Sequence, residues 1–431
     1  MTLTAADARH LMRRAGYGAL DADVSALTGL TRQAAVDHVM DLTGRVDGTS
    51  VPAVTSSSSQ RRMLAHWWVE QMTTSPSPIS ERLIYFWHSH FANSSDRVRD
   101  QRNMKDQHYF MRQYGLGGFH ALLTKIAFGP AMLIDLDNAS NVAGDEQENF
   151  ARELLELYTI GNGRFTEDEV IAVARAWTGH NIEDGSRPPR YAFYADRHDK
   201  HDKTLFGITK KWDAPDTLDE LVNGVRRSWT ADYLAWKLWR EFGDANWWTE
   251  ELITDLANVM QASNMSAVAV VRAIFLRDEF WAPERRFGAV KQPLAWIVEL
   301  QKRTGLRLSE SRLDQRCGVL GQQLFLPPSV AGWGHNGAWL SAASLLARAR
   351  VARDLASGVR DAGHFTGIAD QTPAAAATRI LNFFGVPDAS AATRTVVENW
   401  HIALAEETSS DSWFEREAFR VGALLPEVNL A

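Results

Sequence analysis

The sequence predicts a mostly α-helical protein: a single large, bundle-like body of many helices with long irregular loops and at most a small β-hairpin. Along most of the chain, apolar residues recur three and four positions apart, which is the spacing of one helix face. Gly, Pro or Asn residues separate these segments. The 431 residues are 45% hydrophobic and 23% charged, a composition typical of globular proteins, and they are enough to bury a large core.

The helical pattern begins at the amino terminus, where Thr4 is placed to cap the first helix, and Pro78 precedes another helix. Thr166 and Glu169 form the sequence signature of a capping box for a helix that ends before Gly179. The predicted helices are 4–15, 19–28, 31–42, 60–74, 78–92, 95–114, 116–128, 146–160, 167–178, 217–226, 229–242, 248–262, 265–275, 286–304, 309–324, 341–357, 373–384 and 390–406.

The predicted helix 146–160 carries a concentrated polar stripe. Asp145 is a candidate N-cap with Glu148 three residues later, and Gly161 supplies the C-terminal stop. At about 100° per residue, one side of this helix presents four polar residues, Asn149, Arg152, Glu153 and Glu156. The stripe is either a solvated face with ion pairs along the helix or a set of metal ligands and acid/base carboxylates.

Three stretches interrupt the helical pattern. We interpret 43–60 as a loop and 358–373 as the entry to a C-terminal helical hairpin, which divides the chain into a body, 1–357, and a hairpin packed on it, 358–431. The stretch 181–216 is the longest without a helical period, and its segments 190–195 and 204–207 could form a small hairpin. Such long loops inside a compact domain are often functional.

Composition excludes several classes of protein. The net charge of −7 argues against a nucleic-acid binder, and no stretch of about 18 apolar residues suggests a membrane span. The lone Cys317 cannot form an internal disulfide, and the amino terminus lacks the pattern of a signal peptide. We therefore expect a cytoplasmic protein, or one from which a leader was removed; the sequence leaves the oligomeric state open.

Histidines form the clearest candidates for metal ligands. His88 and His90 lie in the aromatic run FWHSHF at the end of a helix, and imidazole is the commonest metal ligand. Residues two apart on a regular helix point about 200° from one another, so both reach one metal only if the helix ends or distorts there. Otherwise one of them is a hydrogen-bonded core residue and the other is exposed.

Other polar clusters could bind an anionic or polar substrate. The segment 196–203 combines His198 and Asp199 with Lys203, which would suit a metal, an anion or simply solvent. Arg13 and Arg14 place two guanidiniums near a helix end. Residues 326–335 form a loop rich in Pro and Gly, which by default is a structural wedge.

Tryptophan is unusually frequent, with 16 Trp against 8 Tyr. Four of these residues lie within helical patterns and are predicted to pack in the core: Trp177, Trp236, Trp239 and Trp296. Trp87 and Trp333 lie beside the polar clusters, and we expect them at the wall of a site.

Taken in order, these motifs resemble the bacterial domain-of-unknown-function 1800 (DUF1800) family. The resemblance covers about residues 5–350 and is carried by HLMRRAGYG (10–18), FWHSHF (86–91), ENFARELLEL (148–157) with Gly161, ARAWTG (174–179), His198-Asp199 with Lys203 and Gly207, and PPSVAGW (327–333). It implies a large, predominantly helical protein without an established activity; many members are exported and encoded beside a sulfatase-like family. This chain has Gly332-Trp-Gly-His335 where the family usually has Gly-Trp-Pro-Gly.

The dense polar motifs predict a metal-dependent enzyme of hydrolase type, acting on an anionic, polar or glycan-like small molecule between helices. The predicted ligands of a divalent metal ion are His88, His90, Glu153 and His198. The predicted catalytic residues are Arg152, Glu153, Glu156 and His198. The predicted substrate-binding residues are Arg13, Arg14, Trp87, Asn149, Arg175, Asp199, Lys203 and Trp333.

Three alternatives stay open at this point. Iron or copper in the same ligands would give an oxidoreductase. The same residues could instead form a buried ion-pair network in a non-catalytic scaffold or binding protein. A metal-free acid/base enzyme using His88 and Glu153 is the third.

Overall fold

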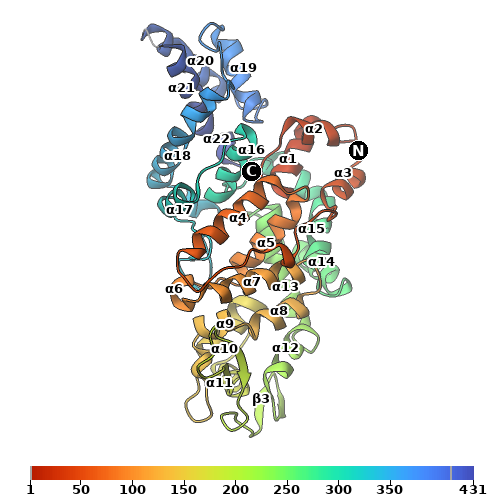
Figure 1. Cartoon of the computed structure of the whole chain (residues 1–431). Coiled ribbons are helices and arrows are strands. Elements are labelled where there is room, and N and C mark those ends of the chain that lie inside the picture. The colour runs from red at the N-terminus through yellow and green to blue at the C-terminus, as the bar shows by residue number, and fades with distance from the viewer. Residues whose placement is uncertain (1, 408–409) are drawn as a thin grey trace.

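The structure, a computed structural model, describes residues 2–407 and 410–431 as an elongated, mostly helical body (Figure 1). The helices up to the strands are α1 (Ala5–Ala15), α2 (Asp21–Leu27), α3 (Arg32–Val39), α4 (Gln60–Thr74), α5 (Pro78–His90), α6 (Ser95–Val98), α7 (Gln101–Tyr114), α8 (Phe119–Ala127), α9 (Pro130–Asp135), α10 (Asn149–Glu153) and α11 (Glu167–Ala176). After the strands follow α12 (Ala214–Val222), α13 (Arg227–Leu238), α14 (Glu250–Ala262), α15 (Ala267–Leu276), α16 (Pro293–Thr304), α17 (Glu310–Val319), α18 (Ala342–Asp361), α19 (Pro373–Phe383), α20 (Ala391–Glu406), α21 (Asp411–Ala423) and α22 (Pro426–Asn429).

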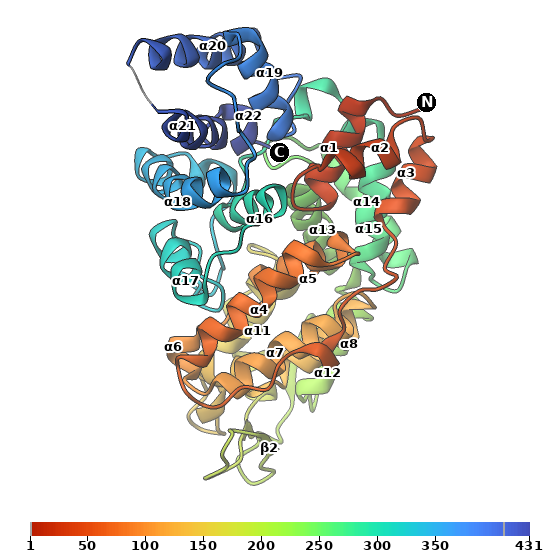
Figure 2. The ribbon, with the colours of Figure 1, turned by 45° about the horizontal axis from the view of Figure 1, so that its top comes forward.

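The strands form two small antiparallel hairpins where one was predicted. In the first, β1 (His180–Ile182) pairs with β2 (Tyr191–Phe193); in the second, β3 (Lys203–Leu205) pairs with β4 (Ile208–Lys210). Figures 1 and 2 place the strands at the lower end of the molecule, far from α1 to α3 and from α18 to α22. The mostly helical fold class with little β structure is confirmed.

Two predicted helices are shorter than the sequence pattern suggests, for backbone reasons. The predicted helix 95–114 breaks into α6 and α7 because Arg99 has a φ of 64°, outside the right-handed helical region, and Asp100 then caps α7. The predicted helix 286–304 begins only at Pro293, whose fixed φ suits the first turn of a helix and whose missing N–H is not needed there.

The predicted helix 146–160 is also different. The helix begins at Asn149 rather than after Asp145, because the Asn141 side chain accepts the Gln147 N–H and holds the preceding residues in a turn. From Leu154–Thr159 the helix widens into a π-helix. Gly161 does end it, with a φ of 85°. The polar stripe therefore does not follow the regular spacing of 100° per residue.

The C-terminal part is larger than a two-helix hairpin. It contains α19 to α22, and α18 runs through the predicted boundary at residue 357 to pack against α21. Figure 2 shows these helices stacked beside α16. Nothing in this arrangement tests whether the two parts are separate domains, so that division stays a prediction.

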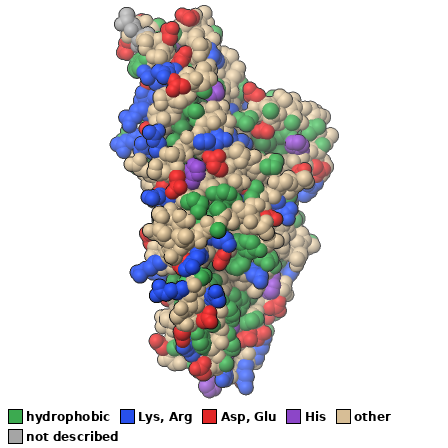
Figure 3. All heavy atoms as spheres, viewed as in Figure 1, with side chains coloured by type: hydrophobic (Ala, Val, Ile, Leu, Met, Phe, Trp, Pro, Cys, Tyr) green, Lys and Arg blue, Asp and Glu red, His purple; other side chains and the backbone are tan. Residues whose placement is uncertain are grey.

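Aromatic residues fill much of the core. Trp177, Trp239 and Trp296 are fully buried, as predicted, whereas Trp236 is only partly buried and borders a groove. On the face in Figure 3, acidic and basic side chains are interspersed with apolar ones. Of the helices that the structure describes, none has both the length and the apolar character needed to cross a membrane.

A fully buried ion pair ties α5 to α7. The Glu81 carboxylate accepts both terminal nitrogens of Arg112 at 2.9 and 2.7 Å and the indole N–H of Trp68 at 2.9 Å. Both charged side chains have 0% exposure. A bidentate pair with an added hydrogen bond satisfies the carboxylate, so loss of one partner would leave a bare charge in the core.

We predict that Arg112→Met lowers the free energy of unfolding by about 3–5 kcal/mol, because Glu81 is then buried without a counter-charge. Urea denaturation followed by circular dichroism measures this. The control is Arg152→Met, which breaks an exposed pair with Glu167 and should cost far less. Equal losses in the two variants would contradict the prediction.

Candidate functional site

The two histidines of the FWHSHF motif lie in different surroundings. His88 accepts the backbone N–H of Phe325 at its Nε2 atom (3.2 Å) and packs against Trp68 and Trp333. His90 donates from Nε2 to the Tyr158 carbonyl (3.1 Å). Burial lowers the pKa of His88 to about 3 and holds that of His90 well below its usual range, so both are neutral at pH 7.

In the polar stripe of α10 and the following π-helix, Asn149 is exposed and Arg152, Glu153 and Glu156 are partly buried. Arg152 forms a bidentate ion pair with Glu167 at 2.8 and 2.6 Å, and Asn149 hydrogen-bonds Asp137 at 3.2 Å. Burial and the nearby Glu156 raise the pKa of Glu153. Glu156 itself borders a groove of about 610 Å³ that is also lined by Tyr233, Trp236 and Trp248.

The predicted cluster around residue 199 holds its own loop together. Arg175 pairs with Asp199 at 2.6 Å, and Lys203 donates to the carbonyls of Asp199, His201 and Trp212 at 2.7–3.1 Å. All three ammonium donors of Lys203 are thus used within the chain. His198 donates from Nδ1 to the Thr178 carbonyl at 2.8 Å. These contacts give the cluster a structural role.

The predicted residues are therefore not brought into one cleft. Arg13 and Arg14 lie on α1, while the cluster around Asp199 lies near α11 and β3 at the opposite end in Figure 1. In residues 2–407 and 410–431, no group of three His, Cys, Asp or Glu side chains is placed to hold one metal ion. Trp87 packs in the core and donates to the Gly115 carbonyl at 2.6 Å. A bound metal stays a prediction.

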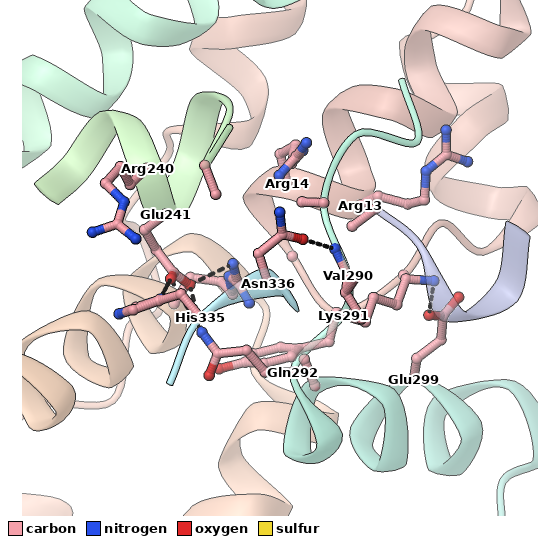
Figure 4. A pocket seen from close by; sticks show the side chains of 18 residues that line it. Arg13, Arg14, Arg240, Glu241, Val290, Lys291, Gln292, Glu299, His335 and Asn336 are labelled. Atoms are coloured by element: carbon pink, nitrogen blue, oxygen red, sulfur yellow. Dashed lines mark hydrogen bonds and ion pairs between the residues drawn. The ribbon is translucent and has the colours of Figure 1, made fainter. Parts of the chain in front are cut away.

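Arg13 and Arg14 line a different site, which we call the cationic cavity. Thr4 caps α1 through a reciprocal capping box with Asp7, and the helix ends at Gly16, so both arginines lie in its last turn, where their guanidiniums contact the backbone of residues 285–286. The cavity encloses about 50 Å³, several times the 10–15 Å³ that one water needs. Figure 4 shows its lining side chains, among them Arg13, Arg14, Tyr17, Arg82, Arg240, Glu241, Lys291, Gln292, Glu299, His335 and Asn336.

The arginines of α1 are buried, and carboxylates act on them only at a distance: Glu299 on Arg13, and Asp244 and Glu241 on Arg14. Arg13 is 7% exposed and Arg14 2% exposed, and neither forms an ion pair with the described residues. Within the part of the chain that the structure describes, their hydrogen bonds are long ones to backbone carbonyls, at 3.4 and 3.5 Å, and their Nε atoms have no partner. Burial lowers the pKa of Arg13 to about 9 and that of Arg14 to about 10, so both stay charged at pH 7.

On another wall of the cavity, Glu241 lies between three neighbours (Figure 4). It accepts Arg82 at 2.9 Å and Gln292 at 3.1 Å, and the His335 Nδ1 atom lies 3.8 Å away. Burial lowers the pKa of His335, although Glu241 opposes this shift, so the imidazole is neutral at pH 7. A neutral imidazole beside a carboxylate is an arrangement suited to accept a proton.

At the floor of the cavity, Glu299 on α16 belongs to a three-charge cluster with Arg303 of the same helix and with Lys291, which lies just before it. Glu299 pairs with Lys291 at 2.6 Å and with Arg303 at 2.9 Å. Burial alone would raise the pKa of Glu299, but the two cations outweigh it and hold the pKa at about 2. Burial lowers the pKa of Lys291 to about 8 despite Glu299. Gly18 is required here because a Cβ atom would lie 2.5 Å from the Glu299 carboxyl group.

A smaller cavity of about 30 Å³ adjoins the cationic cavity, sharing Arg240, Glu241 and His335 with it. We call it the lysine cavity, because Lys237 also lines it, with Ser89 and His90.

The sequence identified Arg13 and Arg14 as candidate binding residues, but it did not identify most of the other residues that line the cationic cavity. Arg240 and Glu241 lie in a π-helix, Trp239–Gly243, and such bulges often occur at functional sites. A π-helix has no characteristic sequence period from which it could be predicted. His335 was noticed only as part of a loop interpreted as a wedge.

The fold and the cavity together define a large helical protein with a buried, positively charged cavity. A family described as "Protein of unknown function (DUF1800)" matches residues 10–426, and the chain belongs to this family. The comparison with curated proteins finds no match, and neither does the comparison with solved structures.

We predict that Glu299→Gln changes how stability depends on pH. The folded pKa of Glu299 is depressed from 4.5 to about 2, so its contribution is fully present above pH 4.5 and is lost as the pH falls toward 2. The variant should be less stable than wild type at pH 7, and the gap should narrow on acidification. Urea denaturation at several pH values from 7 to 3 measures it; a constant gap would contradict the assignment.

Proposed function

We propose that this protein is an enzyme that binds a small anionic substrate in the cationic cavity and hydrolyses it. The observation that carries the proposal is that two nearly fully buried arginines, Arg13 and Arg14, line one cavity without an ion pair to any described residue. Unpaired buried charge is unfavourable, and an anion between these groups would supply the missing partner.

The charge of the lining supports an anion. Its side chains include the cations Arg13, Arg14, Arg82, Arg240 and Lys291, against the carboxylates of Glu241 and Glu299. Both carboxylates are already engaged by Arg82, Lys291 and Arg303. A net positive charge therefore remains in the cavity, and it would attract a ligand with a phosphate or carboxylate group.

The chemistry proposed for this site is hydrolysis with His335 as general base. A neutral His335 would take a proton from water, and Glu241 would stabilise the imidazolium that forms. The arginines would stabilise the negative charge that develops on the substrate in the transition state. Apart from Arg13 and Arg14, these residues differ from the catalytic and binding set predicted from sequence.

A metal-dependent form of the reaction, with either hydrolytic or oxidative chemistry, remains a sequence prediction. The scaffold alternative has one observation in its favour, because the protein does contain buried ion-pair networks. They are built by Glu81 with Arg112 and by Glu299 with Lys291 and Arg303. Among the residues that the sequence suggested, Arg175, Asp199 and Lys203 form a further, partly buried network.

We predict that inorganic phosphate binds to wild type and that Arg14→Met weakens binding about 10- to 100-fold, the worth of one charged hydrogen bond. Isothermal titration calorimetry measures the affinity. At a phosphate concentration tenfold above Kd, wild type should gain about 1.4 kcal/mol of stability. Without phosphate, Arg14→Met should be at least as stable as wild type, because it removes a buried unpaired charge.

The matched control is Arg175→Met, which removes an arginine of the loop cluster at the other end of the molecule and should leave phosphate affinity unchanged. Chloride at equal ionic strength controls for general salt effects. If wild type does not bind phosphate, or if Arg14→Met alone unfolds the protein, the proposed anion site is wrong.

We further predict that His335→Asn lowers the hydrolysis of acetyl phosphate, a small anionic probe, by about 10²- to 10⁴-fold, the usual worth of a general base. Its phosphate affinity should change little, because the cationic groups stay in place. Release of phosphate in a steady-state assay measures the rate. Unchanged turnover in this variant would exclude His335 as the base.

A further inference from the structure

The lysine cavity contains an amine that the proposed hydrolysis does not use. Lys237 lies in the last turn of α13 and lines this cavity together with Arg240. No hydrogen bond or ion pair joins its ammonium group to any residue that the structure describes. Its Nζ atom lies over the aromatic ring of Tyr233, 5.4 Å from the ring centroid.

The surroundings of Lys237 favour the neutral amine. Burial and the neighbouring cation Arg240 lower the pKa of Lys237 to about 7, so much of it is uncharged at neutral pH. The buried lysine of the cationic cavity, Lys291, differs because Glu299 pairs with it. A lysine that is desolvated and placed beside another cation is the arrangement that activates an amine as a nucleophile.

Groups that suit a carbonyl substrate surround this amine. Arg240 lines both cavities, and its guanidinium, which stacks on the Trp236 ring at 4.5 Å, forms no ion pair with any residue that the structure describes, so it can pair with a carboxylate held there. Ser89 and His335 line the same cavity and can exchange protons with a reacting oxygen. His90 also lies in the lining, and its Nδ1 atom has no hydrogen-bond partner among the residues that the structure describes.

We propose that the Lys237 amine forms an imine with a small carboxylate that carries an aldehyde or ketone group, such as a 2-oxo acid. This goes beyond the proposed hydrolysis, and it rests on the proposed function in one respect, since Arg240 serves both sites.

The reaction balances without an oxidant or a further reactant. The lone pair of Nζ attacks the carbonyl carbon, a C–N bond forms, and the carbonyl oxygen takes a proton that nitrogen gives up. The C–O bond of this carbinolamine then breaks, the oxygen leaves as water after a second protonation, and nitrogen loses its remaining proton. The products are the imine and one water molecule.

The test uses glyoxylate, the smallest aldehyde that carries a carboxylate, with cyanoborohydride to reduce any imine to a stable secondary amine. The intact protein is labelled at pH 7.5, and peptide mass spectrometry gives the labelling rate of each lysine. We expect Lys237 to react roughly tenfold or more faster than the exposed Lys200 and the paired Lys291, because its neutral fraction is larger.

Two variants sharpen the test. Lys237→Met should lose the fast adduct while its melting temperature stays near that of wild type, because no partner is left unpaired. Lys237→Arg keeps the positive charge and should also lose it, which separates nucleophilicity from charge. Propionate, a carboxylate without a carbonyl group, should slow the labelling of Lys237 by competing for Arg240.

Labelling of Lys237 no faster than that of Lys200 would overturn the inference, as would fast labelling that persists at another lysine in Lys237→Met. The proposed function fails separately, by an absence of phosphate binding in unlabelled protein. Phosphate binding without fast labelling therefore rejects only the imine chemistry, and fast labelling without phosphate binding supports the amine while rejecting the anion cavity.

Discussion

The buried carboxylate of Glu299 is the interaction on which the arrangement of the upper half of the molecule depends. It pairs with Lys291 and Arg303, and these cations in turn form hydrogen bonds with other segments of the chain. Arg303 also donates to the carbonyls of Ala19 and Phe383, and Lys291 donates to that of Val428. One charge on α16 thus connects the turn after α1 with α19 and α22, segments from both ends of the chain.

Such a cluster constrains the sequence around it. A carboxylate without counter-charges would be strongly unfavourable inside this core, so both cations are required. Gly18 is required for a different reason, since only a residue without a side chain lets the chain approach Glu299 so closely and adopts a φ of 85°. Gly18, the last residue of the Gly-Tyr-Gly sequence after α1, therefore serves packing around a charge.

Buried charged groups that are paired have a structural role, whereas those that are unpaired are candidates for a function. Glu81 with Arg112, and Glu299 with its two cations, are complete as they stand. Arg13 and Arg14 have no ion pair with a described residue, and they line the cationic cavity; the partly buried Lys237 in the adjoining lysine cavity also lacks one. A ligand would supply the partner that Arg13, Arg14 and Lys237 lack. Both proposals therefore concern these two cavities.

The sequence by itself determined most helices and some of their ends, because helix periodicity, Thr4 and Thr166 caps and Pro or Gly stops act within a few residues. It also singled out Arg13 and Arg14. Only the tertiary structure decided that these arginines meet Arg240 and His335, which come from distant parts of the chain. The spacing of residues within a motif cannot specify which helices pack together. The sequence motifs therefore suggested one common cleft, whereas long-range packing places their residues at several separate sites.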